Sequence, residues 1–346
     1  MSGGLIEIVS GGQGCTVQDP GRFGHRHEGV AQAGWLVPPW ADAANALVGN
    51  PVDAAGLEWR GPGLVLQVVR GPVRMAVAGA VRVEVSRGGG PVRSLGAWCS
   101  ATLAEGDRLH LGAAVEGWAC LALGGGVQVP PVLGSRSTHV RTRFGGLDGR
   151  MLAPGDRLSC LRRGDVGTGE HRAPAPLALP TGPIRVLWGP QDDHFTVPAR
   201  ARLLDTDWQV TAEQDRMGMR LAGPPLAHAH AAAADIVSDA VVPGAVQVPA
   251  NGLPVVLLAD GQTVGGYPKI ATVIQADLPR LALMPAGRTL RFEAVDAPTA
   301  RQALRATQAD WQAWVASLVP HRPAGWLDEG ALYHDNLVSG MLRAEP

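Results

Sequence analysis

Apolar and polar residues alternate over short segments of this 346-residue chain, which is the pattern of β-strands rather than of helices. Residues 73–77 and 81–85 place an apolar side chain at every second position, with charged or small residues between them. Further short apolar runs predict strands at 64–69, 109–112, 118–123, 184–188, 208–211, 254–259 and 289–295. We therefore expect a mainly β fold.

Only a few segments have the spacing of helices. A helix with one apolar face is predicted over residues 39–48, because two prolines stand at its start and Asn50-Pro51 follows its end. Two shorter helices are predicted at 197–204 and 277–283. These helices are too few to form a layer of their own.

Residues 163–183 are rich in turn-forming residues and have no hydrophobic period, which is typical of a linker. This linker predicts an N-terminal β-barrel domain over residues 1–165 and a C-terminal β-barrel domain over residues 184–296. Residues 297–346 then form a tail in which leucine and tryptophan recur at near-helical spacing. That spacing predicts a helix that docks on a domain rather than a ligand site.

The composition supports this architecture. The 46 glycines and 28 prolines are too many for a helical bundle, and 46% hydrophobic against 18% charged residues excludes a disordered chain. The four cysteines are widely scattered and form no CxxC pair. Such cysteines are typical of reduced thiols in the cytoplasm, not of disulfides or a zinc site.

The charge and hydropathy of the chain exclude some partners. A formal net charge of −1 without a basic run argues against nucleic-acid binding. No apolar run approaches the roughly 18 residues of a membrane-spanning helix, and the N-terminus lacks the features of a signal peptide. We expect a cytoplasmic protein with neither nucleic acid nor membrane as a partner.

Lys269 is the one lysine among 30 lysine and arginine residues. A codon bias that turns lysines into arginines explains the imbalance. Under such a bias, a surviving lysine marks a place that needs a compact ammonium rather than a rigid guanidinium. Retention by chance is the alternative interpretation.

Standard catalytic and nucleotide motifs are absent from the sequence. It has no GxxxxGK[ST] phosphate loop, no GxGxxG before a helix, no HExxH and no GxSxG. A standard nucleotide fold or hydrolase triad is therefore not expected. The histidine pairs His25/His27 and His228/His230 lack nearby cysteine or carboxylate patterns, so we predict no metal site.

The densest polar cluster follows the apolar run 254–259. A buried strand that ends in convergent polar groups and paired glycines commonly walls a small-molecule pocket. Lys269, Asp260 and Gln262 are the candidate catalytic residues, because these groups can hold a developing oxyanion. The candidate substrate-binding residues of this region are Gln247, Thr263, Gly265, Gly266 and Tyr267. A solvated β-turn is the alternative interpretation.

Two other turns carry charged residues. Gln18, Asp19 and Arg22 lie in a turn that can close on an Asp–Arg pair, and they are further candidate substrate-binding residues. Asp215 and Arg216 are neighbours in a second turn, where the guanidinium can clamp a carboxylate or phosphate. For this second turn taken alone, a surface salt bridge is the favoured interpretation.

Together these segments resemble one known family. The motifs, in the family's order, are Thr16-Val-Gln-Asp-Pro-Gly-Arg-Phe-Gly, Asn45-Ala-Leu-Val-Gly-Asn-Pro, Leu133-Gly-Ser-Arg-Ser-Thr, Gly189-Pro-Gln, Asp215-Arg-Met-Gly, Val242-Pro-Gly-Ala-Val-Gln-Val-Pro and Gly265-Gly-Tyr-Pro-Lys-Ile-Ala-Thr-Val. They resemble the allophanate hydrolase subunit 2-like family. This family includes the C-type subunit of 5-oxoprolinase, the KipI antagonist KipA and part of the carboxyltransferase domain of urea carboxylase. The resemblance covers about residues 5–295.

The resemblance implies two cyclophilin-like β-barrel domains, a cytoplasmic setting and a subunit 1-like partner (the B-type component of 5-oxoprolinase, or a KipI-like protein). In the oxoprolinase, components of types A, B and C together open the lactam of 5-oxoproline with ATP hydrolysis. Phosphorylation of the amide oxygen would supply a leaving group for attack by water. The expected function is the C-type component of such an enzyme, acting on an amide or lactam, with ATP bound in the complex but not necessarily on this chain.

Two alternatives remain within the resemblance. A biotin-dependent carboxyltransferase of the urea carboxylase type would need its biotin carrier from another chain, because no Met-Lys-Met-like segment is present. A KipA-like protein would instead bind and antagonise a KipI-like kinase inhibitor.

The chain departs from the family pattern at several polar positions. Ala33 and Val37 replace an expected serine and aspartate, Met219 an expected tyrosine, Gly261 an expected arginine and His139 an expected aspartate. Loss of several polar groups weakens an electrostatic site. A binding role or a different substrate therefore stays open.

Overall fold

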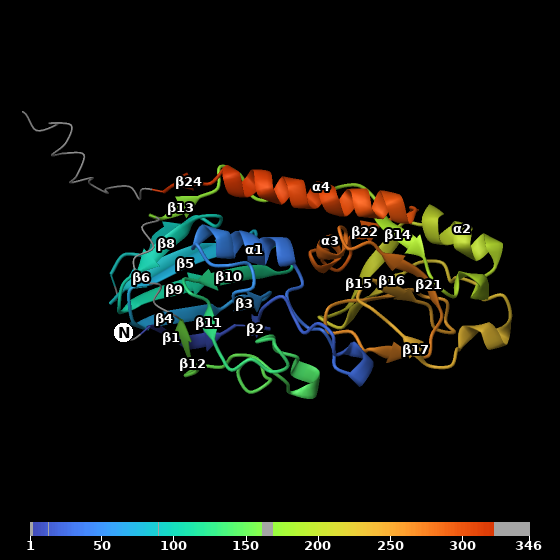
Figure 1. Ribbon diagram of the computed structural model, residues 1–346, viewed down its shortest axis with the longest axis horizontal. Helices are drawn as coiled ribbons and strands as arrows, with labels where there is room; N and C mark the ends of the chain where they lie inside the picture. The colour runs from blue at the N-terminus through green and yellow to red at the C-terminus, as the bar shows by residue number, and fades with distance from the viewer. Residues whose placement is uncertain (1–2, 13, 89, 161–168, 322–346) are drawn as a thin grey trace, which may run out of the picture.

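The computed structural model describes residues 3–12, 14–88, 90–160 and 169–321. They form two halves built of β-sheet, and the helix α4 (Ala297–Ala316) runs across both (Figure 1). The expected mainly β fold with few helices is confirmed.

The N-terminal half contains two antiparallel sheets. The seven-stranded sheet has the order β11 (Val127–Gln128), β12 (Arg157–Cys160), β1 (Gly4–Gly11), β4 (Leu64–Arg70), β9 (Asp107–Leu111), β6 (Val83–Arg87) and β7 (Arg93–Leu95). The five-stranded sheet has the order β2 (Thr16–Gln18), β3 (Gly56–Trp59), β10 (Ala119–Leu123), β5 (Val73–Ala78) and β8 (Ser100–Leu103). A core of alternate strand residues, including Ile8, Leu57 and Leu121, fills the space between them.

The C-terminal half is one eight-stranded sheet that nearly closes on itself. Its order is β22 (Thr289–Leu290), β15 (Trp208–Gln214), β16 (Gly218–Ala222), β19 (Val255–Leu257), β18 (Ala245–Gln247), β21 (Lys269–Val273), β14 (Ile184–Trp188) and β23 (Phe292–Ala294). The first and last strands of this order are separated in the chain by Arg291 alone. One short segment therefore supplies both edges of the sheet, which makes it a nearly closed barrel.

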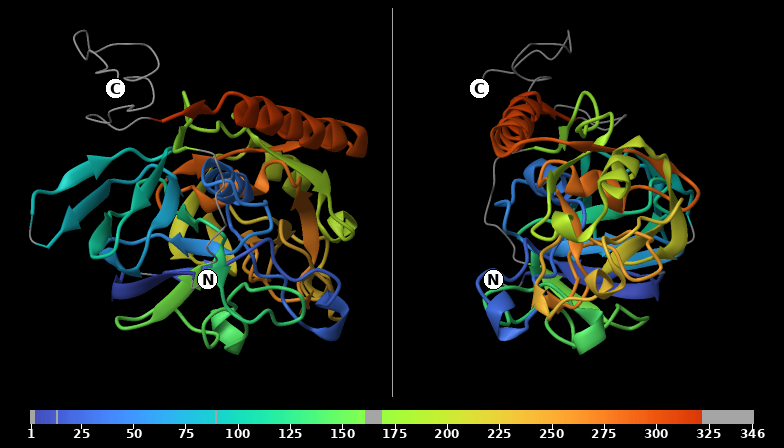
Figure 2. Two further views of the ribbon diagram at one scale, coloured as in Figure 1. Left: turned by 60° about the vertical axis from the view of Figure 1, so that its left-hand side comes forward. Right: turned by 90° about the vertical axis from the view of Figure 1, so that its right-hand side faces the viewer.

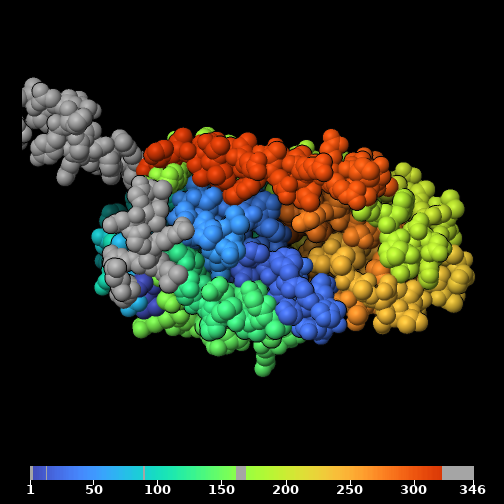
Figure 3. Space-filling model, viewed as in Figure 1, coloured from blue at the N-terminus to red at the C-terminus, as the bar shows by residue number. Residues whose placement is uncertain are grey.

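The second hydrophobic core extends from this barrel to elements of the N-terminal half. Helix α1 (Pro38–Leu47) lies on β5 and β10, and its Trp40 contacts Trp98 edge to face. Trp98 in turn meets Trp314 of α4 at a centroid distance of 6.0 Å. Figure 2 shows α4 lying along one side of the molecule, and Figure 3 shows it above the blue N-terminal residues and the orange C-terminal ones. The two halves therefore share a continuous apolar contact.

The predicted elements match the structure with shifts at their ends. The four predicted helices are α1, α2 (Val197–Asp205), α3 (Leu278–Ala282) and α4. The predicted strand 289–295 is two strands, because the chain changes from β15 to β14 as its partner at Arg291. The predicted strand 81–85 corresponds to β6, which does not include residues 81–82. The predicted strand 254–259 corresponds to β19, which does not include residues 258–259.

The predicted division into residues 1–165, 184–296 and 297–346 stays a prediction, and parts of the linker and of the tail lie outside the described residues. β13 (His171–Arg172) pairs with β24 (Val319–Pro320), so the segment after the linker is joined to the segment after α4. Within the described ranges, no helix combines the length and apolar composition that crossing a bilayer requires.

Candidate functional site

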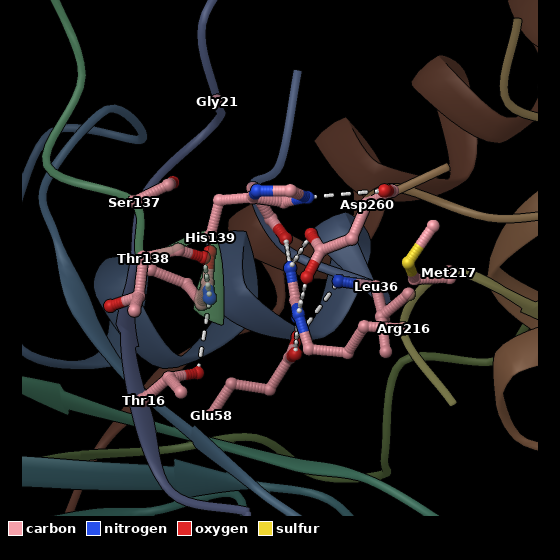
Figure 4. Close-up of polar contacts among 12 residues, drawn as sticks. Thr16, Gly21, Leu36, Glu58, Ser137, Thr138, His139, Arg216, Met217 and Asp260 are labelled. Atoms are coloured by element: carbon pink, nitrogen blue, oxygen red, sulfur yellow. Dashed lines mark hydrogen bonds and ion pairs between the residues drawn. The ribbon is translucent and has the colours of Figure 1, made fainter. Parts of the chain in front are cut away.

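The Arg216 side chain lies buried where the two halves of the molecule meet. Its Nε and Nη2 atoms each donate to a different carboxylate oxygen of Asp260 at 2.9 Å, which is the bidentate geometry of a strong ion pair. Its Nη1 atom donates to Glu58, and Nη2 also donates to the main-chain oxygen of Gly34. Figure 4 shows the guanidinium between the two carboxylates. The interpretation of this turn as a surface salt bridge between Asp215 and Arg216 is therefore wrong.

The network combines side chains from three segments that are far apart in the sequence. Glu58 lies on β3, Arg216 in the turn between β15 and β16, and Asp260 shortly after β19. The amide of Asp260 donates to the main-chain oxygen of Arg216 at 2.9 Å, and the amide of Ala33 donates to the main-chain oxygen of Ala259 at 3.1 Å. The network thus holds the N-terminal half against the barrel.

One guanidinium faces two buried carboxylates in this network. Burial raises the pKa of Glu58 to about 7, although Arg216 and the Leu36 amide, which donates to Glu58 at 2.8 Å, both act to lower it. Burial alone would lower the pKa of Arg216, but Asp260 and Glu58 outweigh it and hold that pKa above its usual range. Arg216 therefore stays charged, and Glu58 is the group of the network that can take up a proton near neutral pH.

A cavity of about 700 Å³ opens beside this network, and we call it the His139 cavity. His139 points its Nε2 atom at the main-chain oxygen of Asp260, 3.2 Å away (Figure 4). Its Nδ1 atom lies 2.6 Å from Thr142 Oγ1. Arg141 also lines the cavity, where its guanidinium contacts Met217 Sδ at 3.2 Å. Within the described residues, no carboxylate lies at ion-pair distance from Arg141, so its charge is available to an anionic ligand.

A second cavity, of about 890 Å³, is lined by residues of β15, β16, β18 and β19, and we call it the Gln247 cavity. Met217 and Gln262 line both cavities and therefore stand between them. Gln262 Nε2 donates to Gln247 Oε1 at 3.2 Å, and the exposed Tyr267 lines the Gln247 cavity. Two predicted site residues, Gln262 and Gln247, are thus in direct contact at a cavity wall.

Lys269 lies apart from Asp260 and Gln262. Its side chain is 5% exposed, and Nζ donates to Asp239 Oδ2 at 2.7 Å. Gln191 also bonds this pair, since its Nε2 donates to Asp239 at 3.2 Å and its Oε1 accepts from the Lys269 amide at 3.2 Å. The amine is sheltered, but Lys269 lines neither cavity, and its ion pair is with Asp239 rather than with Asp260.

Asp239 begins a small two-stranded flap, β17 (Asp239–Ala240) and β20 (Val264–Gly265). The hydrogen bond from Lys269 keeps the pKa of Asp239 below its ordinary value. Arg26, from the N-terminal half, donates to the main-chain oxygens of Val241 at 2.6 Å and Gln262 at 2.9 Å. The flap is therefore held by a cation from each half.

The predicted residues Thr263, Gly265 and Gly266 belong to this flap or adjoin it. Thr263 is buried and lines the His139 cavity, and its main-chain oxygen accepts a hydrogen bond from the Val241 amide at 3.0 Å. A Cβ atom at Gly265 would lie 2.5 Å from Gln247 Nε2, so a larger residue there would displace the Gln247 side chain. Gly265 and Gly266 line neither cavity, and their role in binding stays a prediction.

The N-terminal motif, residues 16–24, supports the site through hydrogen bonds of its side chains. Asp19 Oδ1 accepts from Ser135 Oγ at 2.6 Å and from the Gly21 amide at 2.9 Å, and Gln18 Nε2 donates to Thr138 O at 3.1 Å. The expected Asp19–Arg22 ion pair is not formed. Arg22 instead donates to the main-chain oxygens of Val132 and Ser137, and its guanidinium lies over the Phe144 ring.

Gln18, Asp19 and Arg22 are all buried, so they fix the 132–138 segment that leads to His139. Asp215 has a similar local role, since its Oδ1 accepts from the amides of Met217 and Gly218.

Four of the five departures from the family pattern, all except His139, are buried residues without a polar side chain. Ala33, Val37 and Met219 are each 1% exposed or less. A Cβ atom at Gly261 would lie 3.0 Å from the main-chain oxygen of Leu258, so a larger side chain there needs a backbone shift. These four positions contribute no polar side chain to either cavity, whereas the fifth departure, His139, lines one of them.

Sequence reasoning missed Glu58 and Asp239. A glutamate between Leu57 and Trp59 in a wholly buried strand was a usable signal, because a buried carboxylate needs a partner. Asp239 gave no comparable signal. Among the residues the structure describes, no group of three or more His, Cys, Asp or Glu side chains is placed to hold a metal ion. His25 instead bonds Glu28, and His228 lies 3.1 Å from the Val248 oxygen.

The chain matches a family model described as carboxyltransferase domain, subdomain A and B, over residues 28–294. It is 35% identical to the C-type subunit of 5-oxoprolinase from Escherichia coli over 302 residues, which are 83% of this chain and 90% of that protein. The corresponding Haemophilus influenzae protein is 34% identical, with 84% of this chain and 91% of that protein covered.

Solved structures have the same fold. The urea amidolyase of K. lactis superposes with a TM-score of 0.81 and 26% identity over 92% of this chain, and the chain spans only 21% of that enzyme. The protein TTHA0988 superposes with a TM-score of 0.73 and 33% identity, over 84% of this chain and 56% of its own.

Proposed function

This chain belongs to the family of carboxyltransferase domains with subdomains A and B, and from that premise we propose that it is the C-type component of an ATP-dependent 5-oxoprolinase. The observation that carries the proposal is the extent of the similarity. The 5-oxoprolinase relatives are matched over about nine-tenths of their own length, whereas the urea amidolyase is matched over about a fifth.

The His139 cavity is the proposed substrate site. 5-Oxoproline combines a carboxylate with a neutral lactam. Arg141, which has no carboxylate partner among the described residues, would bind the substrate carboxylate, and Gln262 would bond the lactam group. Arg216 acts through Asp260, because it fixes the segment that carries Gln262. A small anionic amide therefore meets complementary groups in this cavity.

The proposed reaction is ring opening by water. The lactam carbonyl is a weak electrophile, and transfer of the γ-phosphoryl group of ATP to its oxygen creates a leaving group. Water then adds to the phosphorylated carbon, and the C–N bond of the ring breaks as the nitrogen takes up a proton, which leaves an acyl phosphate. A second water hydrolyses this acyl phosphate and gives glutamate and free phosphate. The sequence has no phosphate-loop motif, so we assign ATP binding to the complex and not to this chain.

Lys269 has a positioning role in this proposal. Its ammonium holds Asp239 and thereby the flap, which Thr263 adjoins at the wall of the His139 cavity. A direct catalytic role would require the ammonium to leave Asp239 and reach the substrate. That direct role stays a prediction.

The relatives are named as subunits, so we propose that this chain acts with a B-type (KipI-like) partner and an A-type partner of the oxoprolinase. The test is co-purification with both partners, followed by measurement of 5-oxoproline-dependent ATP hydrolysis. Arg141→Met is expected to raise KM for 5-oxoproline about ten-fold or more, the usual effect of losing a charged hydrogen bond.

Arg143→Met is the matched control for this test. Arg143 is an exposed neighbour that does not line the cavity, so KM is expected to stay within about two-fold. An unchanged KM in Arg141→Met would remove the proposed anchor. Absence of 5-oxoproline-dependent ATP hydrolysis in the wild-type complex would remove the function itself.

A biotin-dependent carboxyltransferase is the second candidate, because the urea amidolyase of K. lactis superposes over 92% of this chain. Such an enzyme needs a biotinyl carrier from another chain. Urea-dependent consumption of carboxybiotin, without 5-oxoproline turnover, would favour this candidate over the first.

A further inference from the structure

Two more cavities adjoin at the junction of the two halves, and the smaller one lies against α4. Their volumes are about 230 and 370 Å³, and both are lined by Pro38, Asp42, Gln275 and Pro279. We call them the Asp42 cavities. None of their lining residues belongs to the His139 or Gln247 cavity, so they are a separate site.

Asp42 is the unusual residue of this site. It lies on α1, and its carboxylate forms no hydrogen bond or ion pair with any residue that the structure describes. Burial raises the pKa of Asp42 to about 7, and no cation among the described residues acts to lower it. A carboxyl group that borders two cavities without a protein partner has its hydrogen-bonding capacity open to a ligand.

The lining of the Asp42 cavities is mostly apolar and otherwise acidic or neutral. Trp35, Leu258 and Leu278 line the larger cavity, and Leu304 and Trp311 line the smaller one. The polar lining residues besides Asp42 are Gln32, Gln275, Thr307, Gln308 and Asp310. Neither lining contains a lysine, arginine or histidine.

We propose that the Asp42 cavities bind a small organic cation, a protonated amine on an apolar body. The ammonium would give Asp42 the charge partner that none of the described residues supplies, and the apolar body would fill the space between the leucine and tryptophan side chains. Asp42 and Asp310 both repel anions. 5-Oxoproline is therefore a poor ligand here, and the site is independent of the proposed lactam site.

The charge of Asp42 makes binding depend on pH. The titratable groups that face it are Asp310 on α4 and the Cys120 thiol on β10, whose pKa burial raises well above its ordinary value. Cys120 thus stays neutral between about pH 5.5 and 8. Asp42 is mostly protonated below its pKa of about 7 and ionised above it, so affinity for an ammonium rises with pH.

The test uses benzylammonium, with benzyl alcohol as a neutral probe of the same shape, in calorimetric titrations of the full chain. At about pH 8, benzylammonium is expected to bind about ten-fold or more tightly than benzyl alcohol, and its affinity should fall about ten-fold at about pH 5.5. Asp42→Asn should remove the preference for the cation and leave benzyl alcohol within about two-fold. Asp310→Asn is the matched control and should weaken benzylammonium by less than about three-fold.

Three results would overturn the proposal: equal affinity for both probes, no binding of benzylammonium, or full retention of its affinity in Asp42→Asn. Should Asp42→Asn fail to fold, the ratio of wild-type affinities at high and low pH decides, and equal affinities contradict the proposal. If Asp42→Asn weakens association with the oxoprolinase partners while benzylammonium never binds, Asp42 is a protein contact and the ligand site is wrong. This binding test does not depend on the proposed function. If the complex has no 5-oxoprolinase activity, the expected binding of benzylammonium is unchanged.

Discussion

Arg216 and Lys269 are both buried cations that bind carboxylates, yet they connect different parts of the molecule. Arg216 bonds two carboxylates that are themselves buried, and it joins the N-terminal half to the barrel. Lys269 bonds one carboxylate, Asp239, which is 50% exposed and belongs to a flap of the barrel. The same type of interaction therefore stabilises an interface in one region and fixes a cavity wall in the other.

The two cations differ in the carboxylates that would lose a partner if each cation were removed. Without Arg216, the carboxylates of Glu58 and Asp260 would remain buried and face each other, which is costly. Without Lys269, Asp239 would be solvated by water, which costs little. We therefore expect Arg216 to matter mainly for stability and Lys269 mainly for activity.

The largest expected effect is that of Arg216→Met. The free energy of unfolding should fall by about 3–5 kcal/mol, because two buried carboxylates lose their partner. Urea denaturation of the isolated chain measures this. Arg220→Met is the control, because Arg220 forms an ion pair with Glu213 on the exposed surface and its loss should cost about 0.5 kcal/mol or less. Equal losses in the two variants would contradict a structural role specific to Arg216.

Lys269→Met is expected to reduce activity much more than stability. Methionine retains the apolar stem, so the free energy of unfolding should change by about 1 kcal/mol or less, whereas misplacement of the flap should lower kcat/KM about 100-fold. Lys269→Arg is expected to be impaired as well, since a guanidinium does not fit the space of an ammonium. The measurement is 5-oxoproline-dependent ATP hydrolysis by the complex. Wild-type activity in Lys269→Arg would show that the site does not require a lysine.

A smaller effect is expected from Glu58→Gln, and it depends on pH. The pKa of Glu58 is raised to about 7 in the folded chain, above the ordinary 4.5, so its favourable contribution is complete below pH 4.5 and is lost as pH rises through 7. The wild-type chain should therefore lose about 2 kcal/mol of stability from Glu58 between about pH 5 and 8. Glu58→Gln should lose correspondingly less, as measured by urea denaturation at several pH values. Parallel pH profiles would mean that Glu58 stays ionised throughout.

The sequence predicted the elements better than it predicted their contacts. Alternating apolar residues located strands such as β5 and β6, and prolines marked the start of α1, because these signals are local. The partner change at Arg291 was missed because it depends on the closure of the barrel. Local pattern contains no information about which strands become the edges of a sheet.

Local sequence pattern also located some residues of the candidate site, but it did not predict their long-range contacts. Asp260, Gln262 and Gln247 lie on cavity walls because they follow or end buried strands. The pairing of Arg216 with Glu58 spans 158 residues, so it arises only when the two halves meet. Lys269 was correctly predicted to be sheltered, but its partner Asp239 lies on a flap whose position depends on the pairing of β17 with β20.

Gln262 best distinguishes the activity of the site from the stability of the fold. It lines both cavities, and its side chain bonds neither Arg216 nor Lys269. The decisive measurement is the rate of 5-oxoproline-dependent ATP hydrolysis by the complex that contains Gln262→Ala, alongside the melting temperature of the variant chain. We predict that the rate falls about 100-fold while the melting temperature stays within about 2 °C of the wild type. A wild-type rate at an unchanged melting temperature would contradict the assignment of the substrate to this cavity.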